Sequence, residues 1–581
     1  MCGIVGILSE QPHSIRSNTL HMLKRLEYRG YDSVGVATLE GDIQKEAGQV
    51  DPFVATITDY ETCGSIAHTR WATHGGVSRV NSHPHSDATG EFMIVHNGII
   101  ENADELQAMV PGCRPLSETD SEVIAAFFRH RVVEDGLSME EAIQDFFRVT
   151  EGTYAVLLMR KGDERMYALK HNSPLALARV GGLAGGAFVL ASDISAFSDE
   201  TGEAYFFDDM TYAIVAPDAF EVFGADGAAH AMVPHSFEWS SEEATLEEHP
   251  HFMIKEILEQ PQTALRLLES FRTIQSEPLT AFAAHMKRAR RIVFLSCGTS
   301  YHASLIGAFM LNQLNYEAHT VIASEFENFI LVDASTFVIA ISQSGETMDV
   351  ILPLKQIIDD CAGLGAIVNV PHSTIQRLST VSLDLLAGQE ICVASTKAFT
   401  NQVIALMGLA ERLGFDIDLS VIPGKISQTL EDIDPICKHL ADELSDRNEI
   451  YVLGRGAAYP MAREIALKFK EIDYIHAEGM MAGELKHGTL ALIEDGTPVI
   501  CLIPGSDRSM LSSQREVEAR GARTIVVSNT GEGEVNVPPS GNAEFAIYAC
   551  LFGHLLSYYI GVARDLPIDK PRNLAKSVTV G

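Results

Sequence analysis

The chain opens with Met1-Cys2-Gly3-Ile4-Val5-Gly6-Ile7, a thiol placed directly before a short apolar run that predicts the first strand of a buried sheet. Removal of Met1 would leave Cys2 with a free α-amine, whose reference pKa of roughly 7.7 to 8 lets it accept the thiol proton. A nucleophile that carries its own base is a recognised arrangement for acyl transfer. Taken alone, a cysteine at this position is more often a small buried residue.

Similar apolar runs recur as far as about residue 238, interrupted by Gly, Asp and Asn, and they predict strands buried on at least one face. The predicted strands are Ile4–Leu8, Ser33–Leu39, Ser65–His68, Phe92–His96, Tyr154–Met159, Phe188–Ala191 and Tyr212–Val215. Helical spacing predicts helices over Asn18–Leu26 and Asp120–Arg131, and Thr119 or Asp120 is a candidate cap of the second.

Composition limits the classes of partner. The 581 residues predict roughly three to five structural units. The formal charge of −35, with no Lys/Arg-rich run, makes nucleic acid or an anionic membrane an unexpected partner. Nine scattered cysteines, without metal spacing or a signal peptide, predict a reduced cytoplasmic protein with no metal site. The uncharged stretch Phe545–Ala563 is interpreted as a buried helix rather than a membrane span.

Polar residues follow three of the predicted strands, and together they suit an amidase that acts on a free amino acid. Arg70 offers a bidentate fork for an α-carboxylate, and Asp120 offers an anion for an α-ammonium. The Asn97 side chain and the Gly98 N–H offer an oxyanion hole. Each has a plainer alternative: Asn97-Gly98 is most often a turn, Arg70 and Asp120 are most often surface charges, and Asp120 is also a candidate helix cap.

The first hundred residues resemble the N-terminal-nucleophile glutamine amidotransferases. The motifs that carry the resemblance are Cys2-Gly3-Ile4-Val5-Gly6, Glu27-Tyr28-Arg29-Gly30-Tyr31-Asp32-Ser33, Arg70-Trp71-Ala72-Thr73-His74-Gly75, His83-Pro84-His85 and His96-Asn97-Gly98. The resemblance implies an αββα domain over residues 2–237 that hydrolyses glutamine at Cys2. It implies that glutamine or its oxyanion is bound by Arg29, Arg70, Thr73, His74, Asn97, Gly98 and Asp120. It also implies that Trp71 gates an ammonia channel, although an aromatic core plug is the plainer interpretation.

After an acidic linker at residues 238–248, strands alternate with longer helices and the chain repeats itself. Ile292–Tyr301 aligns with Ile450–Tyr459 at an offset of 158, and Thr336–Ile341 aligns with Thr497–Leu502 at an offset of 161. Two doubly wound parallel-sheet domains are expected, at residues 249–423 and 424–565, followed by a tail at 566–581.

The first copy carries a hydroxyl-rich turn, Ser342-Gln343-Ser344-Gly345-Glu346-Thr347, between a strand and a helix. Such a turn suits a phosphate because a helix N-terminus is electropositive. Ser300 and Val393-Ala394-Ser395-Thr396-Lys397 add hydroxyls at similar strand ends. The second copy has Ile503-Pro504-Gly505-Ser506-Asp507 instead, so one phosphate site is predicted. Plain capping is the alternative for any one such turn.

The second copy supplies ionisable groups. Lys468 and Glu471 are three residues apart and share a helical face, which alone is typical of a surface ion pair. His487 is a candidate proton shuttle. Lys576 lies in a segment whose composition is that of a frayed tail.

These segments resemble the sugar isomerase half of the isomerising glutamine–fructose-6-phosphate aminotransferases, and with the amidotransferase motifs the resemblance covers nearly the whole chain. It implies synthesis of glucosamine 6-phosphate, the first step of the hexosamine pathway, from glutamine and fructose 6-phosphate by a homodimer. His487 would open the sugar ring, in the neighbouring subunit's site. Lys576 would form a Schiff base, Glu471 would move a proton, and Lys468 would assist. The sugar phosphate would be bound by Ser300, Ser342, Gln343, Ser344, Thr347, Val393, Ser395, Lys468 and Ala575. No metal or organic cofactor is expected, since the ketone is the electron sink.

Two departures from the family pattern concern loops: Thr489 follows His487-Gly488 where proline is usual, and the loop after Gly75 is Gly76-Val77-Ser78-Arg79-Val80-Asn81. Two alternatives stay open. One is another amidotransferase, such as a phosphoribosyl-pyrophosphate user, which would need an acidic, Thr-rich diphosphate loop that the sequence lacks. The other is a non-catalytic sensor of sugar phosphates, which would not need Glu471, His487 and Lys576.

Overall fold

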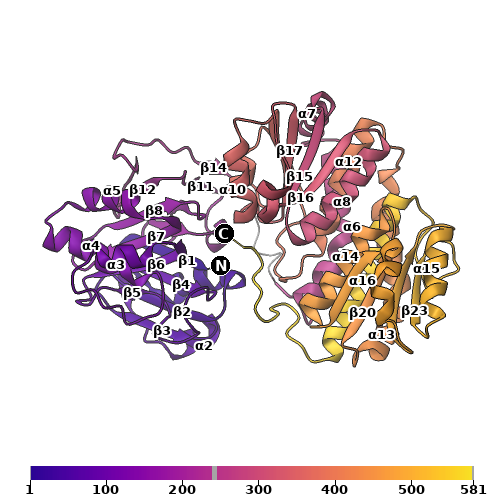
Figure 1. The fold of residues 1–581 in the computed structure, drawn as a ribbon. Coiled ribbons are helices and arrows are strands. Elements are labelled where there is room, and N and C mark those ends of the chain that lie inside the picture. The colour runs from indigo at the N-terminus through magenta and orange to yellow at the C-terminus, as the bar shows by residue number, and fades with distance from the viewer. Residues whose placement is uncertain (1, 238–244, 579–581) are drawn as a thin grey trace. The chain divides into compact units, whose positions relative to one another are not determined.

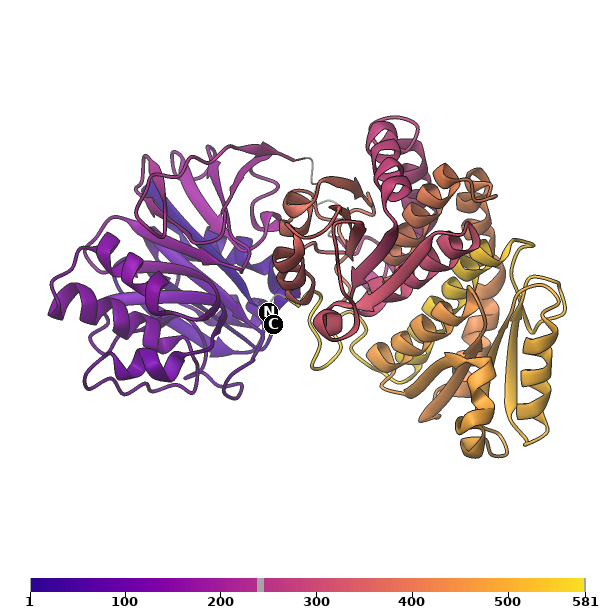
Figure 2. The same ribbon diagram turned by 45° about the horizontal axis from the view of Figure 1, so that its top comes forward.

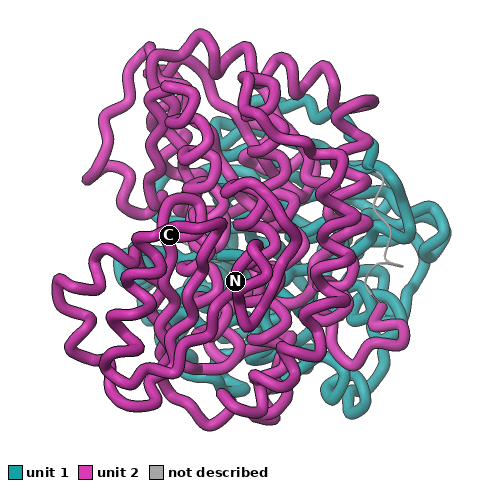
Figure 3. The backbone as a smooth tube through the Cα atoms, turned by 90° about the vertical axis from the view of Figure 1, so that its right-hand side faces the viewer, with its two compact units in different colours: residues 1–243, 577–581 teal, residues 244–576 magenta. Residues whose placement is uncertain are grey.

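The computed structural model describes residues 2–237 and 245–578, and the chain divides into two compact units (Figure 3). Unit 1 comprises residues 1–243 with 577–581, and unit 2 comprises residues 244–576. Three sequence predictions fall partly outside the described residues: the removal of Met1, the linker at residues 238–244, and the end of the tail at residues 579–581.

Unit 1 is built on two antiparallel sheets (Figure 1). In spatial order, the eight-stranded sheet contains β14 (His235–Ser236), β11 (Glu203–Phe206), β9 (Ala176–Val180), β10 (Ala187–Ala191), β1 (Gly3–Ser14), β4 (Glu61–Arg70), β2 (Ser33–Thr38) and β3 (Ile43–Ala47). The six-stranded sheet contains β13 (Phe220–Gly224), β12 (Thr211–Val215), β8 (Met166–His171), β7 (Gly152–Arg160), β6 (Phe92–Ile100) and β5 (His85–Ser86). Every strand predicted from the sequence is present.

The two sheets pack face to face between outer helices, and β1 shows why. Alternate side chains of a strand face opposite sides, so Ile4 and Leu8 enter the core between the sheets while Val5 and Ile7 enter the core beneath the outer helices. Gly6 faces the inner core, where a Cβ would lie 2.7 Å from Met166 Sδ. The outer helices are α1 (Leu20–Lys24) and α2 (Val50–Thr56) on one side and α3 (Ala103–Ala108), α4 (Glu122–Arg129) and α5 (Met139–Val149) on the other. The predicted αββα fold is confirmed.

Unit 2 contains two parallel five-stranded sheets with the same spatial order of strands, which accounts for the internal repeat. The first is β16 (Glu317–Ile322), β15 (Arg291–Ser296), β17 (Thr336–Ser342), β18 (Gly363–Val368) and β19 (Val381–Asp384). The second is β21 (His476–Met481), β20 (Glu449–Gly454), β22 (Pro498–Ile503), β23 (Arg523–Ser528) and β24 (Val535–Asn536). Two doubly wound domains are thus confirmed as the fold class of this half.

Helices flank both parallel sheets (Figure 2). They are α6 (Phe252–Ser270), α7 (Ser276–Arg288), α8 (Gly298–Gln313), α9 (Phe326–Phe329), α10 (Met348–Ile357), α11 (Thr374–Leu378), α12 (Lys397–Leu413), α13 (Ile422–Leu444), α14 (Ala458–Ile472), α15 (Arg508–Glu518) and α16 (Asn542–Ala563). By length and composition α16 could cross a membrane, but 89% of its most apolar window is buried, and it packs against α13 and α14. It is a core helix of unit 2.

Both helices predicted in unit 1 begin elsewhere than expected. The stretch Asn18–Leu26 overlaps a π-helical turn over Ile15–Thr19 and then α1 over Leu20–Lys24. The helix expected over Asp120–Arg131 begins as α4 at Glu122, with Ser121 at its N-cap, and continues beyond Arg129 as a π-helical turn. Neither Thr119 nor Asp120 caps it. The Asp120 carboxylate instead accepts a hydrogen bond from the backbone N–H of Ile100, 2.7 Å away at the end of β6.

Candidate active sites

The Cys2 thiol lies at the edge of the eight-stranded sheet, where β1 begins beside the end of β4. Gly3 pairs with Thr69, so Cys2 stands next to Arg70 and Trp71. The Cys2 backbone N–H donates to Asn97 Oδ1 at 3.3 Å, and the Cys2 Sγ–H donates to the Trp71 carbonyl at 3.8 Å. Three segments that are far apart in the sequence are therefore brought together around one sulfur atom.

The amide of Asn97 offers an unused donor beside this thiol. Its Oδ1 is engaged by Cys2, whereas its buried Nδ2 has no hydrogen-bond partner among the residues described. A buried donor without a partner is costly unless a ligand uses it. Gly98 follows with φ +144°, and a Cβ there would lie 1.9 Å from the Thr153 carbonyl oxygen, so only glycine fits. This geometry suits an oxyanion hole.

Arg70, the predicted carboxylate clamp, is occupied by its own loop in this structure. Its guanidinium donates to the carbonyls of His74, Gly75 and Gly76, the last at 3.2 Å. Burial lowers the pKa of Arg70, while the nearby Cys2 and Asp120 act in the opposite direction. To take a ligand carboxylate, Arg70 would have to exchange these carbonyls for it, which would move the loop.

The remaining predicted glutamine-site residues differ in how firmly they are held. The Asp120 carboxylate also accepts from the Ser121 hydroxyl at 3.1 Å, and that hydroxyl lies 2.8 Å from His96 Nδ1. Thr73 and His74 are exposed on the Arg70 loop. Arg29 pairs with Asp193 at 2.9 Å and donates to the Cys2 carbonyl at 3.4 Å, so it supports the backbone of Cys2.

In unit 2 the hydroxyl-rich turn joins β17 to α10, as predicted. The Ser342 hydroxyl accepts from the Gly345 N–H at 3.0 Å and lies 3.0 Å from Thr347 Oγ1. The Ser344 hydroxyl accepts from the Glu346 N–H at 3.2 Å. Gly345 has φ +66°, and a Cβ there would meet Ser373 Oγ at 2.0 Å. These bonds shape the turn around the N-terminus of α10.

Further hydroxyls lie at the start of α8, which follows β15, and in the segment before α12. Ser300 lies in the first turn of α8, and its Oγ accepts from Gln402 Nε2 at 2.9 Å. Ser395 Oγ is buried without a partner among the described residues. Gln343 precedes Ser344 in the turn, and Val393 N–H donates to the Asp569 carbonyl at 3.1 Å, which fixes the C-terminal tail here.

Lys468 is fully buried, which contradicts the plainer interpretation of a surface ion pair. Its Nζ lies 2.7 Å from Glu471 Oε2 and 3.2 Å from Glu464 Oε1. It also donates to Thr299 Oγ1 at 3.3 Å and to the Ser395 carbonyl at 3.4 Å, so α14 of the second copy reaches the hydroxyls of the first. Burial lowers the pKa of Lys468, but Glu464 and Glu471 outweigh it, so the pKa is raised.

Glu464 is the second buried charge of this cluster. Burial raises its pKa, but the lowering effects of Lys468 and His302 are larger together, so the pKa falls to about 2. His302 Nδ1 lies 2.6 Å from Glu464 Oε2. Glu464 therefore stays ionised and holds Lys468 as an ammonium ion.

Lys576, at the end of the described tail of unit 2, is not frayed. Its ammonium pairs with the Glu390 carboxylate, and both side chains are buried. Glu390 also accepts from the backbone N–H groups of Thr396 and Ala398, where α12 begins. The tail is anchored by Asp569, whose carboxylate accepts from the Phe252 and Met253 N–H groups at 2.9 Å each. Ala575, beside Lys576, is half-buried.

A further buried carboxyl, Glu256, lies next to this pair. Its pKa is raised to about 8 by burial and by Glu390, against the opposing charge of Lys576. The pKa of Glu390 is lowered to about 2, because Lys576 and the backbone donors outweigh burial. An ionised Glu390 and a protonated Glu256 are thus the stable combination near neutral pH.

His487 is the predicted site residue that the fold does not bring to the cluster. It is exposed at the end of a 3-10 turn, Ala482–His487, and its side chain makes no hydrogen bond or ion pair within the described ranges. Sequence reasoning missed Glu390, Glu256, Glu464 and His302. Glu464 could have been found, because it is four residues before Lys468 on the same helical face. No local pattern links Glu390 to Lys576.

Family models match both halves. A glutamine amidotransferase domain matches residues 68–199, and a SIS domain matches residues 285–412 and 443–536. A solved glucosamine-6-phosphate deaminase from Thermotoga maritima superposes with a TM-score of 0.50 at 22% identity, covering 57% of this chain and all of its own, and it supports the fold of unit 2. Fold and sites define a glutamine amidotransferase joined to paired sugar isomerase domains.

Two relatives narrow this class of protein to one family. Glutamine–fructose-6-phosphate aminotransferases (isomerizing) from Thermococcus kodakarensis and from Staphylococcus aureus are each 38% identical over 613 residues, covering 100% of both chains. The chain belongs to the family of isomerizing glutamine–fructose-6-phosphate aminotransferases. This similarity over the whole length leaves no basis for the phosphoribosyl-pyrophosphate user or for the non-catalytic sensor.

Proposed function

We propose that the chain makes glucosamine 6-phosphate from fructose 6-phosphate, with the side-chain amide of glutamine as its nitrogen source. The similarity to the named relatives over the full length carries this assignment. The two clusters support it, since one offers a thiol with an unused amide donor and the other offers buried lysines with carboxylates.

At the glutamine site, the Cys2 thiolate attacks the amide carbon after its proton has passed to the α-amine of Cys2. The Asn97 Nδ2 and the Gly98 N–H stabilise the oxyanion, with each donor worth on the order of 3 kcal/mol. Ammonia leaves with that proton, and water then cleaves the thioester to glutamate. Arg70 and Asp120 bind the carboxylate and the ammonium of the amino acid.

At the sugar site, the turn between Ser342 and Thr347 binds the phosphate. His487, supplied by the neighbouring subunit of a homodimer, opens the ring. Lys576 condenses with the C2 ketone to an imine and releases water, and ammonia then replaces the lysine at C2. Glu471 moves a proton from C1 to C2, which completes the isomerisation to the amino aldose. Lys576, which the ionised Glu390 holds in place, must lose its ammonium proton before it attacks.

Ammonia has to reach the ketone without protonation by bulk water. We assign Trp71 to gate its passage, because the residue lies beside the Cys2 thiol, which donates to its backbone carbonyl. The C-terminal tail that carries Lys576 closes on the sugar site, and the enzyme works in the cytoplasm. No metal or organic cofactor enters any step.

An assay for glucosamine 6-phosphate formed from glutamine and fructose 6-phosphate tests the proposal. The wild type should form product. A Cys2→Ala variant should form none from glutamine, yet should still isomerise the sugar phosphate measurably. Loss of both activities in Cys2→Ala would contradict two separate sites, and absence of product from the wild type would contradict the assignment.

A further inference from the structure

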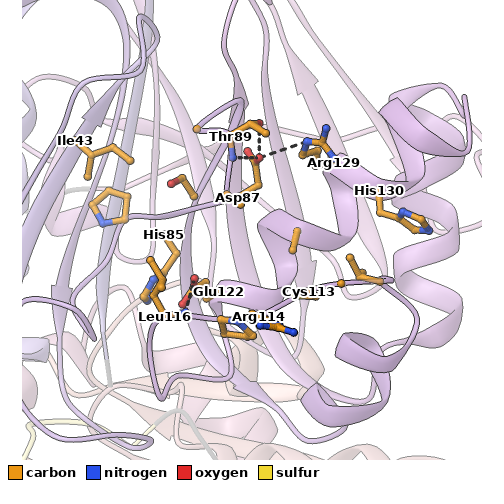
Figure 4. A pocket seen from close by; sticks show the side chains of 18 of the residues that line it. Ile43, His85, Asp87, Thr89, Cys113, Arg114, Leu116, Glu122, Arg129 and His130 are labelled. Atoms are coloured by element: carbon orange, nitrogen blue, oxygen red, sulfur yellow. Dashed lines mark hydrogen bonds and ion pairs between the residues drawn. The ribbon is translucent and has the colours of Figure 1, made fainter.

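A cavity of about 1230 Å³ opens in unit 1, and it does not include Cys2, Arg70, Asn97 or Asp120 (Figure 4). Its walls come from β3, from the turn after β5, from the loop of residues 110–116 and from α4. In Figure 4, Ile43 and His85 face Arg129 and His130 across the hollow, and Arg114 and Leu116 lie at its lower edge. No step proposed above uses this cavity.

The cavity concentrates cations in a chain whose formal charge is −35. Four of its lining residues are Lys45, Arg79, Arg114 and Arg129. Asp87, Glu122 and Glu134 also line the cavity, so its cations exceed its carboxylates by one, and two of these carboxylates lie against a single cation, Arg129. Glu122 accepts from the Leu116 and Ser117 N–H groups at 3.0 and 2.7 Å, Asp87 accepts from the Phe92 N–H at 2.7 Å, and Glu134 pairs with Arg129 at 2.8 Å.

Two of the cations have no such partner. Arg79 and Arg114 are exposed at the mouth of the cavity, and their guanidinium groups make no hydrogen bond or ion pair with any residue that the structure describes. A guanidinium matches the geometry of phosphate oxygens and binds them through paired, charge-assisted hydrogen bonds. Ile43, Val110 and Leu116 add apolar surface on which an organic group could pack.

The segments that carry these two arginines also carry the glutamine site. Asn81 Nδ2 donates to Glu118 Oε2 and to the Gly76 carbonyl, both at 3.0 Å, and the Glu118 N–H donates back to Asn81 Oδ1 at 3.0 Å. The Arg79 segment therefore continues into the loop held by Arg70, and the Arg114 segment leads to Asp120. A ligand that bridges the arginines would fix one segment relative to the other.

We propose that this cavity binds a small organic phosphate through Arg79 and Arg114, and that its binding changes the affinity of the enzyme for glutamine. The binding stands independently of the proposed function. Only the predicted change in glutamine affinity rests on the proposed function.

Isothermal titration of the full-length protein with inorganic pyrophosphate, at constant ionic strength, tests the binding. The sugar-phosphate turn in unit 2 also binds phosphate, so wild type and Arg79→Ala/Arg114→Ala are compared, since they share that turn. The double variant should bind one pyrophosphate fewer per chain, or bind it at least about tenfold more weakly at this site. Equal binding by both proteins, or binding by neither, would overturn the proposal.

A matched control removes the same charge elsewhere. Arg288 and Arg412 are exposed arginines of unit 2 with no ion pair among the described residues, and Arg288→Ala/Arg412→Ala should titrate like the wild type. An equal loss in this control would assign the effect to net charge and contradict a site.

Glutamine hydrolysis, followed as glutamate release with and without pyrophosphate, tests the coupling. The KM for glutamine should shift at least about threefold in the wild type and not in Arg79→Ala/Arg114→Ala. Binding without a shift in KM would overturn the coupling alone. Absence of any glutamine hydrolysis would count against the proposed function, while the titration result would stand.

Discussion

In unit 2, β17 and β22 occupy the same place in two sheets of identical strand order, but the helices that follow them begin differently. Thr347, the N-cap residue of α10, makes no side-chain capping bond within the described part of the chain. Asp507, the N-cap residue of α15, accepts from the Ser509 and Met510 N–H groups at 2.9 and 3.2 Å. One helix start is open to an anion, whereas the other already holds one.

The helices that follow the first strand of each copy, α8 after β15 and α14 after β20, also differ, and here it is the second copy that carries the charged groups. At the offset of 158, Glu464 and Lys468 of α14 correspond to Ile306 and Met310 of α8, and all four side chains are buried. One duplicated backbone thus carries a hydroxyl-rich turn in its first copy and a buried ionic cluster in its second. The lesson is that N-caps and a few helix positions can change chemistry without changing the fold.

The largest effect, on stability, is expected from giving α14 the residues found at the equivalent positions of α8. Lys468→Met alone should lower the free energy of unfolding by about 3 to 5 kcal/mol, because it leaves buried Glu464 without its main counter-charge. Glu464→Ile/Lys468→Met, which matches the first copy, should recover most of that loss and yet form no product. Denaturation curves measure both variants. A double variant as unstable as the single one would show that the two copies are not equivalent scaffolds.

The converse exchange concerns the phosphate. Thr347→Asp places a carboxylate at the N-terminus of α10 and should weaken fructose 6-phosphate binding roughly 100-fold, because the anion would occupy and repel the phosphate position. Titration of the sugar phosphate measures this, and Asp507→Thr is the matched control with unchanged binding. Unimpaired binding by Thr347→Asp would remove the phosphate from this turn.

A pH effect should separate the carboxyl groups around Lys576. The pKa of Glu256 is raised to about 8 from the ordinary 4.5, so the folded protein holds this proton more tightly than the unfolded chain. Its contribution to stability is complete below about pH 4.5 and is lost as pH rises to about 8. Glu256→Gln does not titrate, so its Tm should fall less than that of the wild type between pH 5 and 8, by roughly 3 °C. Identical pH profiles would contradict a protonated Glu256.

The smallest effect, on stability, is expected at the N-cap of α15. Asp507→Ala should cost about 1 kcal/mol of stability through the lost cap and leave the rate of synthesis unchanged. Thermal melting and the product assay measure the two quantities. A large fall in synthesis would mean that the second copy also binds substrate at this turn.

The sequence predicted what is local. Each strand of unit 1 that it proposed exists, because apolar runs bounded by turn residues are a local signal. The sequence misplaced the start of α4. Asp120 is a residue type that often caps helices, but its carboxylate accepts a hydrogen bond from the Ile100 N–H at the end of β6 instead. Spacing placed Lys468 and Glu471 on one face but did not reveal that Lys468 faces inward. The Lys576–Glu390 pair spans 186 residues and exists only in the folded chain.

We propose that Lys576, held by Glu390 in a buried site, forms an imine with the open sugar. Borohydride reduction in the presence of fructose 6-phosphate, followed by peptide mass spectrometry, tests it most directly. We expect one covalent sugar-phosphate adduct, on Lys576. An adduct on Lys468 or on any other lysine, or no adduct while product is still being formed, would contradict it.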